Sequence, residues 1–169
     1  MLACAMSKPQ VQHIDPRNIG LRTLDLKQPV FGPDAIARAD ETLKAMAGSM
    51  QQWIETDITR LQDLRLAAEA ARWDQASVDA LMWSAHDLKG LGATYGYPLV
   101  TEIAASLCRL TETDEGKAVV MSDPTLARAH VDALRAIVRG AIRSHDHPVG
   151  AALRQTLEDE VAKLGVAPR

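Results

Sequence analysis

The chain of 169 residues has few aromatic side chains and no excess of positive charge. It contains three tryptophans, two tyrosines and one phenylalanine, and its formal net charge is −3. Proteins that bind nucleic acid need a positive surface for the phosphates and, for single strands, aromatic rings that stack on the bases. The composition therefore argues against a nucleic-acid partner.

Cysteine and long hydrophobic runs are scarce as well. Cys4 and Cys108 lie far apart without CxxC spacing, which suits a reducing compartment better than a disulfide scaffold. The start, MLACAMSKPQ, has no basic segment and only a short apolar run before Lys8. We therefore expect a cytoplasmic protein with no signal peptide, membrane span or membrane partner.

Nucleotide and metal motifs are missing from the sequence. Neither GxxxxGK[ST] nor GxGxxG occurs, so we expect no bound cofactor and no ATP-dependent kinase activity of the chain itself. His145 and His147 flank Asp146 in a metal-like pattern. A helix-opening Pro148 follows at once and no third ligand is identifiable, so we expect no metal.

What the sequence does contain is a series of alanine- and leucine-rich segments with helical periodicity and cap signals. The first 33 residues hold four of the eight prolines and show no such period. We expect them to form an N-terminal arm that is partly extended or flexible, followed by one helical domain over residues 34–166. The expected fold class is all-α, an up-and-down antiparallel bundle with a four-helix core and accessory helices.

The cap signals divide this domain into helices. Gly48 is expected to end the first helix, and Ser49 with Gln52 forms a capping box for the second. A polar loop is expected over residues 113–122. The expected helices cover 33–48, 49–72, about 74–96, and three segments that begin at 98, 124 and 148.

One stretch of the third expected helix, SAHDLKGLGATYGY over residues 84–97, holds one histidine and three glycines. Its buried face is predicted by alternating steps of four and three residues, at Leu81, Ala85, Leu88, Gly92 and Tyr95. A second face, which should point to solvent, holds His86 with Met82, Lys89 and Ala93.

The simplest interpretation of His86 is a solvated surface histidine. Gly90 argues for more, because it clears the surface one turn after the imidazole at a cost on the order of 1 kcal/mol of helix stability relative to alanine. A neutral imidazole is a good nucleophile, and Lys89 on the same face can balance the charge of a phosphoryl group. These residues predict a histidine that accepts a phosphoryl group.

HDLKG, followed by the small Ala93 and by TYGY, resembles the HxxKG…G signature of histidine-containing phosphotransfer (HPt) domains. The TYGY ending is similar to the phosphotransfer domain of chemotaxis histidine kinases. The resemblance implies that His86 carries the phosphoryl group, that Lys89 stabilises it and that Gly90 gives a receiver domain steric access.

Many members of that family place a glutamate near the histidine on the following helix. By counting along this chain, Cys108 occupies about that place. Neither Glu102 nor Glu112 is assigned as its substitute, so the residue that orients His86 stays unassigned.

The resemblance implies a two-component phosphorelay between receiver-domain aspartates, or from a kinase to a response regulator. The implied partners are receiver domains and an upstream hybrid histidine kinase, with Mg²⁺ bound by the receiver and not by this chain. An HPt bundle closes its core as a monomer, so we expect a monomer. The partner surface is expected around the histidine, on Met82, Trp83, Asp87, Ala93 and Tyr97.

Two alternatives stay open. SAHDLK also resembles the SxH[ED]L[RK] opening of the dimeric phosphotransfer hairpin of histidine kinases, although that family continues with Thr or Asn and then Pro, where this chain has Gly90 and Leu91. The other alternative is a non-catalytic helical interaction module in which the histidine is incidental. Molar mass tests the first, and acid-labile phosphate on the protein tests the second.

Overall fold

The computed structural model describes residues 32–165, which contain six helices and no strand. The chain divides into two compact units, residues 1–43 and 44–169. In the first unit the described residues 32–43 include the start of α1 (Pro33–Ala70), where Arg38 and Thr42 each hydrogen-bond a carbonyl one turn earlier. Except for its last two residues, the arm expected over 1–33 lies outside the described part of the chain.

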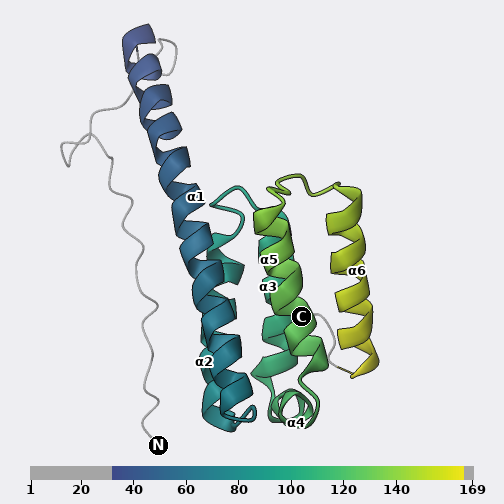
Figure 1. Ribbon diagram of the computed structural model, residues 1–169. Coiled ribbons are helices and arrows are strands. Elements are labelled where there is room, and N and C mark those ends of the chain that lie inside the picture. The colour runs from purple at the N-terminus through teal and green to yellow at the C-terminus, as the bar shows by residue number, and fades with distance from the viewer. Residues whose placement is uncertain (1–31, 166–169) are drawn as a thin grey trace, which may run out of the picture. The chain divides into compact units, whose positions relative to one another are not determined.

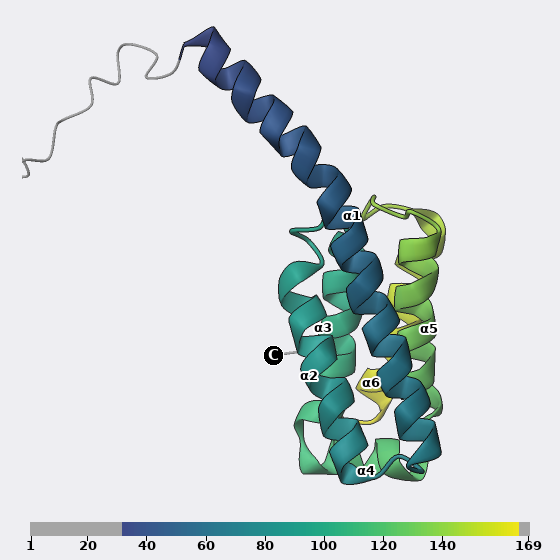
Figure 2. The ribbon, with the colours of Figure 1, turned by 60° about the vertical axis from the view of Figure 1, so that its left-hand side comes forward.

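The second unit is a bundle whose long helices alternate in direction (Figure 1 and Figure 2). It comprises α1 from Lys44 onward, α2 (Gln75–Leu91), α3 (Pro98–Glu112), α4 (Asp114–Ser122), α5 (Thr125–Arg139) and α6 (Pro148–Lys163). The short α4 lies at one end of the bundle, and α6 packs against α3 and α5. The predicted all-α fold class and helical bundle are confirmed.

The core is formed by one apolar stripe from each long helix, and α3 supplies the most completely buried one. Its predicted face is wholly buried: Leu99, Ile103, Leu107 and Leu110. Burial of each such side chain contributes about 1.5–3 kcal/mol relative to exposure. Facing stripes come from α1 through Ile54, Ile58 and Leu61, from α2 through Leu81 and Leu88, and from α5 through Leu134 and Ile137.

The predictions for the end of the first helix and for the segment 113–122 are wrong. Helix α1 continues through Gly48 and Ser49, because one glycine costs only about 1 kcal/mol and does not outweigh the hydrogen bonding of a 38-residue helix. The segment 113–122 is not a loop but contains α4. Thr113 caps this helix by accepting a hydrogen bond from the Gly116 N–H at 3.1 Å, and Val120 enters the core.

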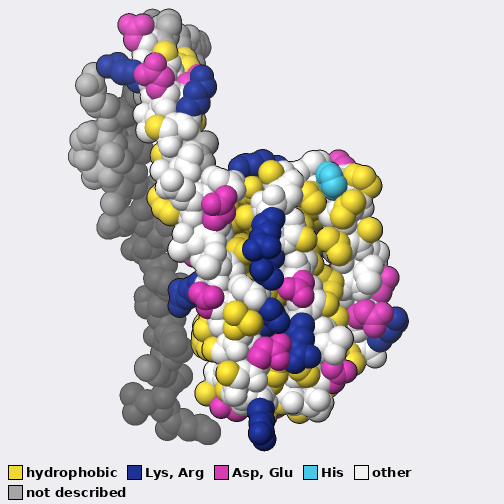
Figure 3. Space-filling model, in the orientation of Figure 1, with side chains coloured by type: hydrophobic (Ala, Val, Ile, Leu, Met, Phe, Trp, Pro, Cys, Tyr) yellow, Lys and Arg dark blue, Asp and Glu magenta, His cyan; other side chains and the backbone are white. Residues whose placement is uncertain are grey.

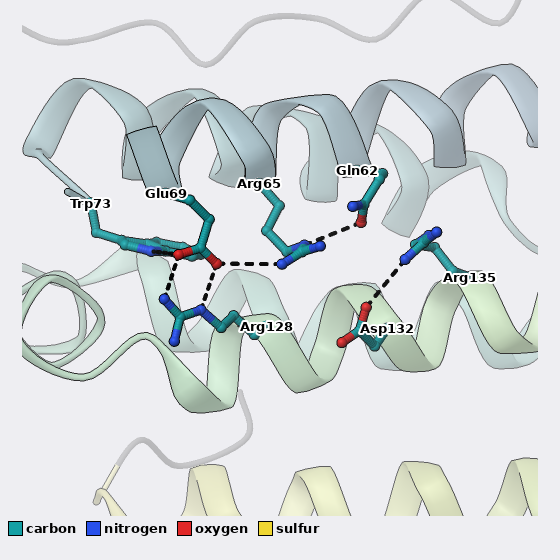
Figure 4. Close-up of polar contacts among 7 residues, drawn as sticks. All are labelled: Gln62, Arg65, Glu69, Trp73, Arg128, Asp132 and Arg135. Carbon is teal, nitrogen blue, oxygen red and sulfur yellow. Dashed lines mark hydrogen bonds and ion pairs between the residues drawn. The ribbon is translucent and has the colours of Figure 1, made fainter. Parts of the chain in front are cut away.

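A polar network joins α1 to α5 on the face where basic and acidic side chains alternate in Figure 3. Figure 4 shows its centre, the Glu69 carboxylate, which accepts hydrogen bonds from Arg128, Arg65 and the Trp73 indole. The Arg128 guanidinium also lies 5.6 Å from the centroid of the buried Trp73 ring. The hydrogen bond from Arg128 is the main reason that the pKa of Glu69 lies below its usual value. These contacts fix α1 against α5.

Candidate functional site

The site is built on α2. Asp74 starts this helix by accepting a hydrogen bond from the Ser77 N–H at 2.9 Å. Downstream, Leu81, Ala85 and Leu88 are buried as predicted. Because these three residues fix the rotation of the helix, the side chain of His86 is exposed, also as predicted.

Two of the three glycines after the histidine have a structural role. Helix α2 ends at Leu91 instead of near Gly96, and the chain then turns into α3. A Cβ on Gly92 would lie 2.8 Å from the Thr101 backbone nitrogen, because the start of α3 crosses the turn there. Gly96 has a φ of +82°, a conformation that side chains disfavour. Both glycines therefore serve the connection between α2 and α3.

Gly90 has no such role within this part of the chain. It lies inside α2, it is exposed, and a Cβ built on it would meet no atom within 4 Å. Alanine would fit and would favour the helix. The missing side chain leaves bare backbone beside the exposed imidazole of His86, where another molecule can approach.

Lys89 lies one turn after the histidine on the same face of α2 and is half-buried. Behind this face lies Cys108 of α3, whose thiol is buried. Burial raises the pKa of Cys108 to about 11, and the positive charge of Lys89 acts in the opposite direction. The thiol near Lys89 is therefore uncharged at neutral pH.

An aromatic ring lies against the imidazole. The Trp83 and His86 rings are arranged edge to face, with centroids 6.2 Å apart and an interplanar angle of 68°. Trp83 is 63% exposed, Asp87 and Ala93 are also exposed, and Met82 is half-buried. Four of the five predicted partner-binding residues are thus at least partly exposed to solvent near the histidine.

Tyr97 is the exception, and its predicted place on the surface is wrong. The side chain is fully buried, its hydroxyl donates a hydrogen bond to Gln51 Oε1 at 2.8 Å, and the Arg143 guanidinium lies 4.6 Å from the ring centroid. The positive φ of Gly96 ends the turn, so Tyr97 enters the core at the start of α3.

Sequence reasoning missed the contribution of α1. Burial raises the pKa of the half-buried Asp57, and the negative charge of Asp87 adds to this effect. The Tyr95 hydroxyl forms a hydrogen bond with Asp57 that acts in the opposite direction. Trp53, 48% exposed, packs on Tyr95 with the ring centroids 6.3 Å apart. The spacing of Trp53 and Asp57 could have indicated this contribution, because residues four apart share one face of a helix.

His145 and His147, which form the metal-like pattern in the sequence, both contact other residues of this chain. His145 Nδ1 lies 2.9 Å from Glu102 Oε1, and His147 caps α6 by accepting a hydrogen bond from the Gly150 N–H at 3.4 Å. Within residues 32–165, no group of three His, Cys, Asp or Glu side chains is arranged to hold a metal ion. Within the same range, no helix is long and apolar enough to cross a membrane.

Comparison with protein-family models, curated proteins and solved structures gives no match for this chain. An exposed imidazole, with an amine and bare glycine backbone each about one turn away, can accept a phosphoryl group and present it to a second protein.

Proposed function

We propose that the protein is a histidine phosphotransfer protein that relays a phosphoryl group through His86. The group comes from a receiver-domain aspartate or an upstream hybrid histidine kinase and passes to a response regulator. The observation that carries the proposal is Gly90, a mid-helix glycine beside an exposed histidine with no atom near its missing side chain. Since glycine weakens a helix by about 1 kcal/mol relative to alanine, close approach by a partner accounts for it best.

The proposed reaction is an in-line displacement. An imidazole nitrogen of His86 attacks the phosphorus of an aspartyl phosphate, the N–P bond forms as the O–P bond breaks, and the aspartate leaves as a carboxylate. The ammonium of Lys89 offsets charge on the phosphoryl oxygens. The receiver domain contributes Mg²⁺, which provides most of the charge stabilisation.

The proposed docking surface consists of Met82, Trp83, Asp87 and Ala93 around the histidine. It combines large apolar side chains with a charged rim, as transient interfaces do. The bundle buries its core within one chain, which supports a monomer, and a cytoplasmic location fits the relay chemistry.

Incubation of the purified protein with kinases and ³²P-labelled receiver domains of its own organism tests the proposal. Label should move to an acid-labile, base-stable position on this chain and from there to a second receiver. Absence of label from every donor would contradict the relay and favour an interaction module. A dimeric molar mass would favour the kinase-like hairpin instead.

Substitutions of Gly90 should distinguish its effect on the approach of a partner from its effect on the stability of the protein. Gly90→Leu is expected to slow transfer by about tenfold or more, equivalent to at least about 1.4 kcal/mol of lost docking. Gly90→Ala should raise the free energy of unfolding by about 0.5–1 kcal/mol. Gly92→Ala is the matched control, and it should lower stability because its Cβ would lie 2.8 Å from the Thr101 nitrogen. Parental transfer by a folded Gly90→Leu variant would remove Gly90 from the site.

Lys89→Ala should slow transfer by about tenfold, less than the loss of the nucleophile itself, because Mg²⁺ in the receiver carries most of the charge stabilisation. Lys89→Arg retains the charge and should recover part of the rate. Single-turnover transfer from a phosphorylated receiver measures both variants. A loss in Lys89→Ala as complete as that caused by removing His86 would contradict an assisting role.

A further inference from the structure

The edge-to-face pair of Trp83 and His86 is formed by two exposed side chains on one turn of α2. Helical side chains lean toward the N-terminus of their helix, so a ring at position 86 leans over the turn that carries position 83. An indole with 63% of its surface exposed gains little from the core of this chain. The contact between Trp83 and the imidazole therefore needs an explanation other than core packing.

Lys89, on the face of α2 that carries His86, lies near Cys108 of α3. The buried thiol of Cys108 stays protonated at neutral pH because its pKa is about 11. A neutral thiol is a weak acceptor and holds an imidazole poorly compared with a carboxylate. The contact that remains to restrict the imidazole is the one with the Trp83 ring.

We propose that Trp83 is a positioning residue for His86, whose imidazole it holds in a restricted set of rotamers with a nitrogen open to solvent. The biological meaning of this inference rests on the proposed relay, but the restraint is a property of this chain alone. An aromatic pair biases a rotamer by about two- to tenfold beyond burial of its area. A ring that is already oriented loses less freedom on reaching the in-line geometry.

Phosphoramidate separates positioning from docking because it needs no partner protein. Its P–N bond breaks, the phosphorus bonds to an imidazole nitrogen of His86, and ammonia leaves. We expect Trp83→Leu to slow this labelling by about three- to tenfold, and Trp83→Phe to stay within about twofold of the parent. Val149→Ala is the control, since this exposed side chain lies on α6, which does not pack against α2 within the described residues, and it should leave the rate unchanged.

The NMR chemical shifts of the His86 ring protons give a second readout. The indole ring current should displace them in the parent protein, and Trp83→Leu, but not Val149→Ala, should remove the displacement. Unchanged shifts, or labelling of Trp83→Leu at or above the parental rate, would overturn the inference. If these results hold while no receiver exchanges label with His86, the relay fails and the ring restraint stands.

Discussion

Replacement of His86 by glutamine is expected to abolish phosphotransfer and leave the fold intact. The packing of α2 depends on Leu81, Ala85 and Leu88, which are buried, whereas the imidazole is exposed. Glutamine is a good helix former, so the helix should persist. Its amide nitrogen has no free lone pair for attack on phosphorus, so no phosphoryl bond can form.

The measurement is label transfer from a phosphorylated receiver, with a thermal melt of each variant to check folding. His145→Gln is the matched control, since it also replaces an exposed histidine and should accept label like the parent. Acid-labile label on a folded His86→Gln protein would place the acceptor elsewhere. Loss of label in the His145→Gln control would do the same.

The parts of the site that depend on local periodicity could be predicted from the sequence. The four-three spacing of Leu81, Ala85 and Leu88 fixes the rotation of α2, and this alone places His86 and Lys89 on the outer side. The bundle follows in the same way from one apolar stripe on each helix. No long-range information is needed for either conclusion.

The parts that depend on packing between distant segments could not be predicted. Trp53 and Asp57 lie near the site only because α1 packs beside α2 and the Tyr95 turn. Tyr97 is buried because α2 ends at Leu91 and the following turn, which includes Gly96 with its positive φ, brings this ring into the core at the start of α3. Likewise, the periodicity predicts Gly92 on the buried face of the helix, but not that the start of α3 crosses it so closely that a Cβ would lie 2.8 Å from the Thr101 nitrogen.

A buried histidine should make the bundle sensitive to acid. His130 of α5 is fully buried, with Nδ1 2.7 Å from the Leu126 carbonyl oxygen and Nε2 3.0 Å from Ser106 Oγ. A carbonyl can only accept, so Nδ1 carries the proton and Nε2 accepts from the serine hydroxyl, which describes a neutral ring. Burial lowers the pKa of His130 to about 4, and the hydrogen bond to Leu126 opposes this only in part.

The sign of the effect follows from proton uptake. The unfolded chain protonates this histidine near pH 6.5, and the folded protein does so only near pH 4. Between these values the unfolded state binds one more proton, so the free energy of unfolding falls by about 1.4 kcal/mol per pH unit as acid is added. The stabilisation is complete above pH 6.5, and about 3 kcal/mol of it is lost as the pH falls through 4.

Urea unfolding at neutral pH and near pH 5 measures this loss. The parent should be less stable near pH 5 by about 2 kcal/mol from His130 alone. His130→Gln should be less stable at neutral pH, because it replaces a packed and hydrogen-bonded ring, yet it should lose less on acidification. His86→Gln is the control, and it should retain the slope that His130 contributes. If acidification destabilises His130→Gln as much as the parent, the buried ring is not the acid-sensitive group.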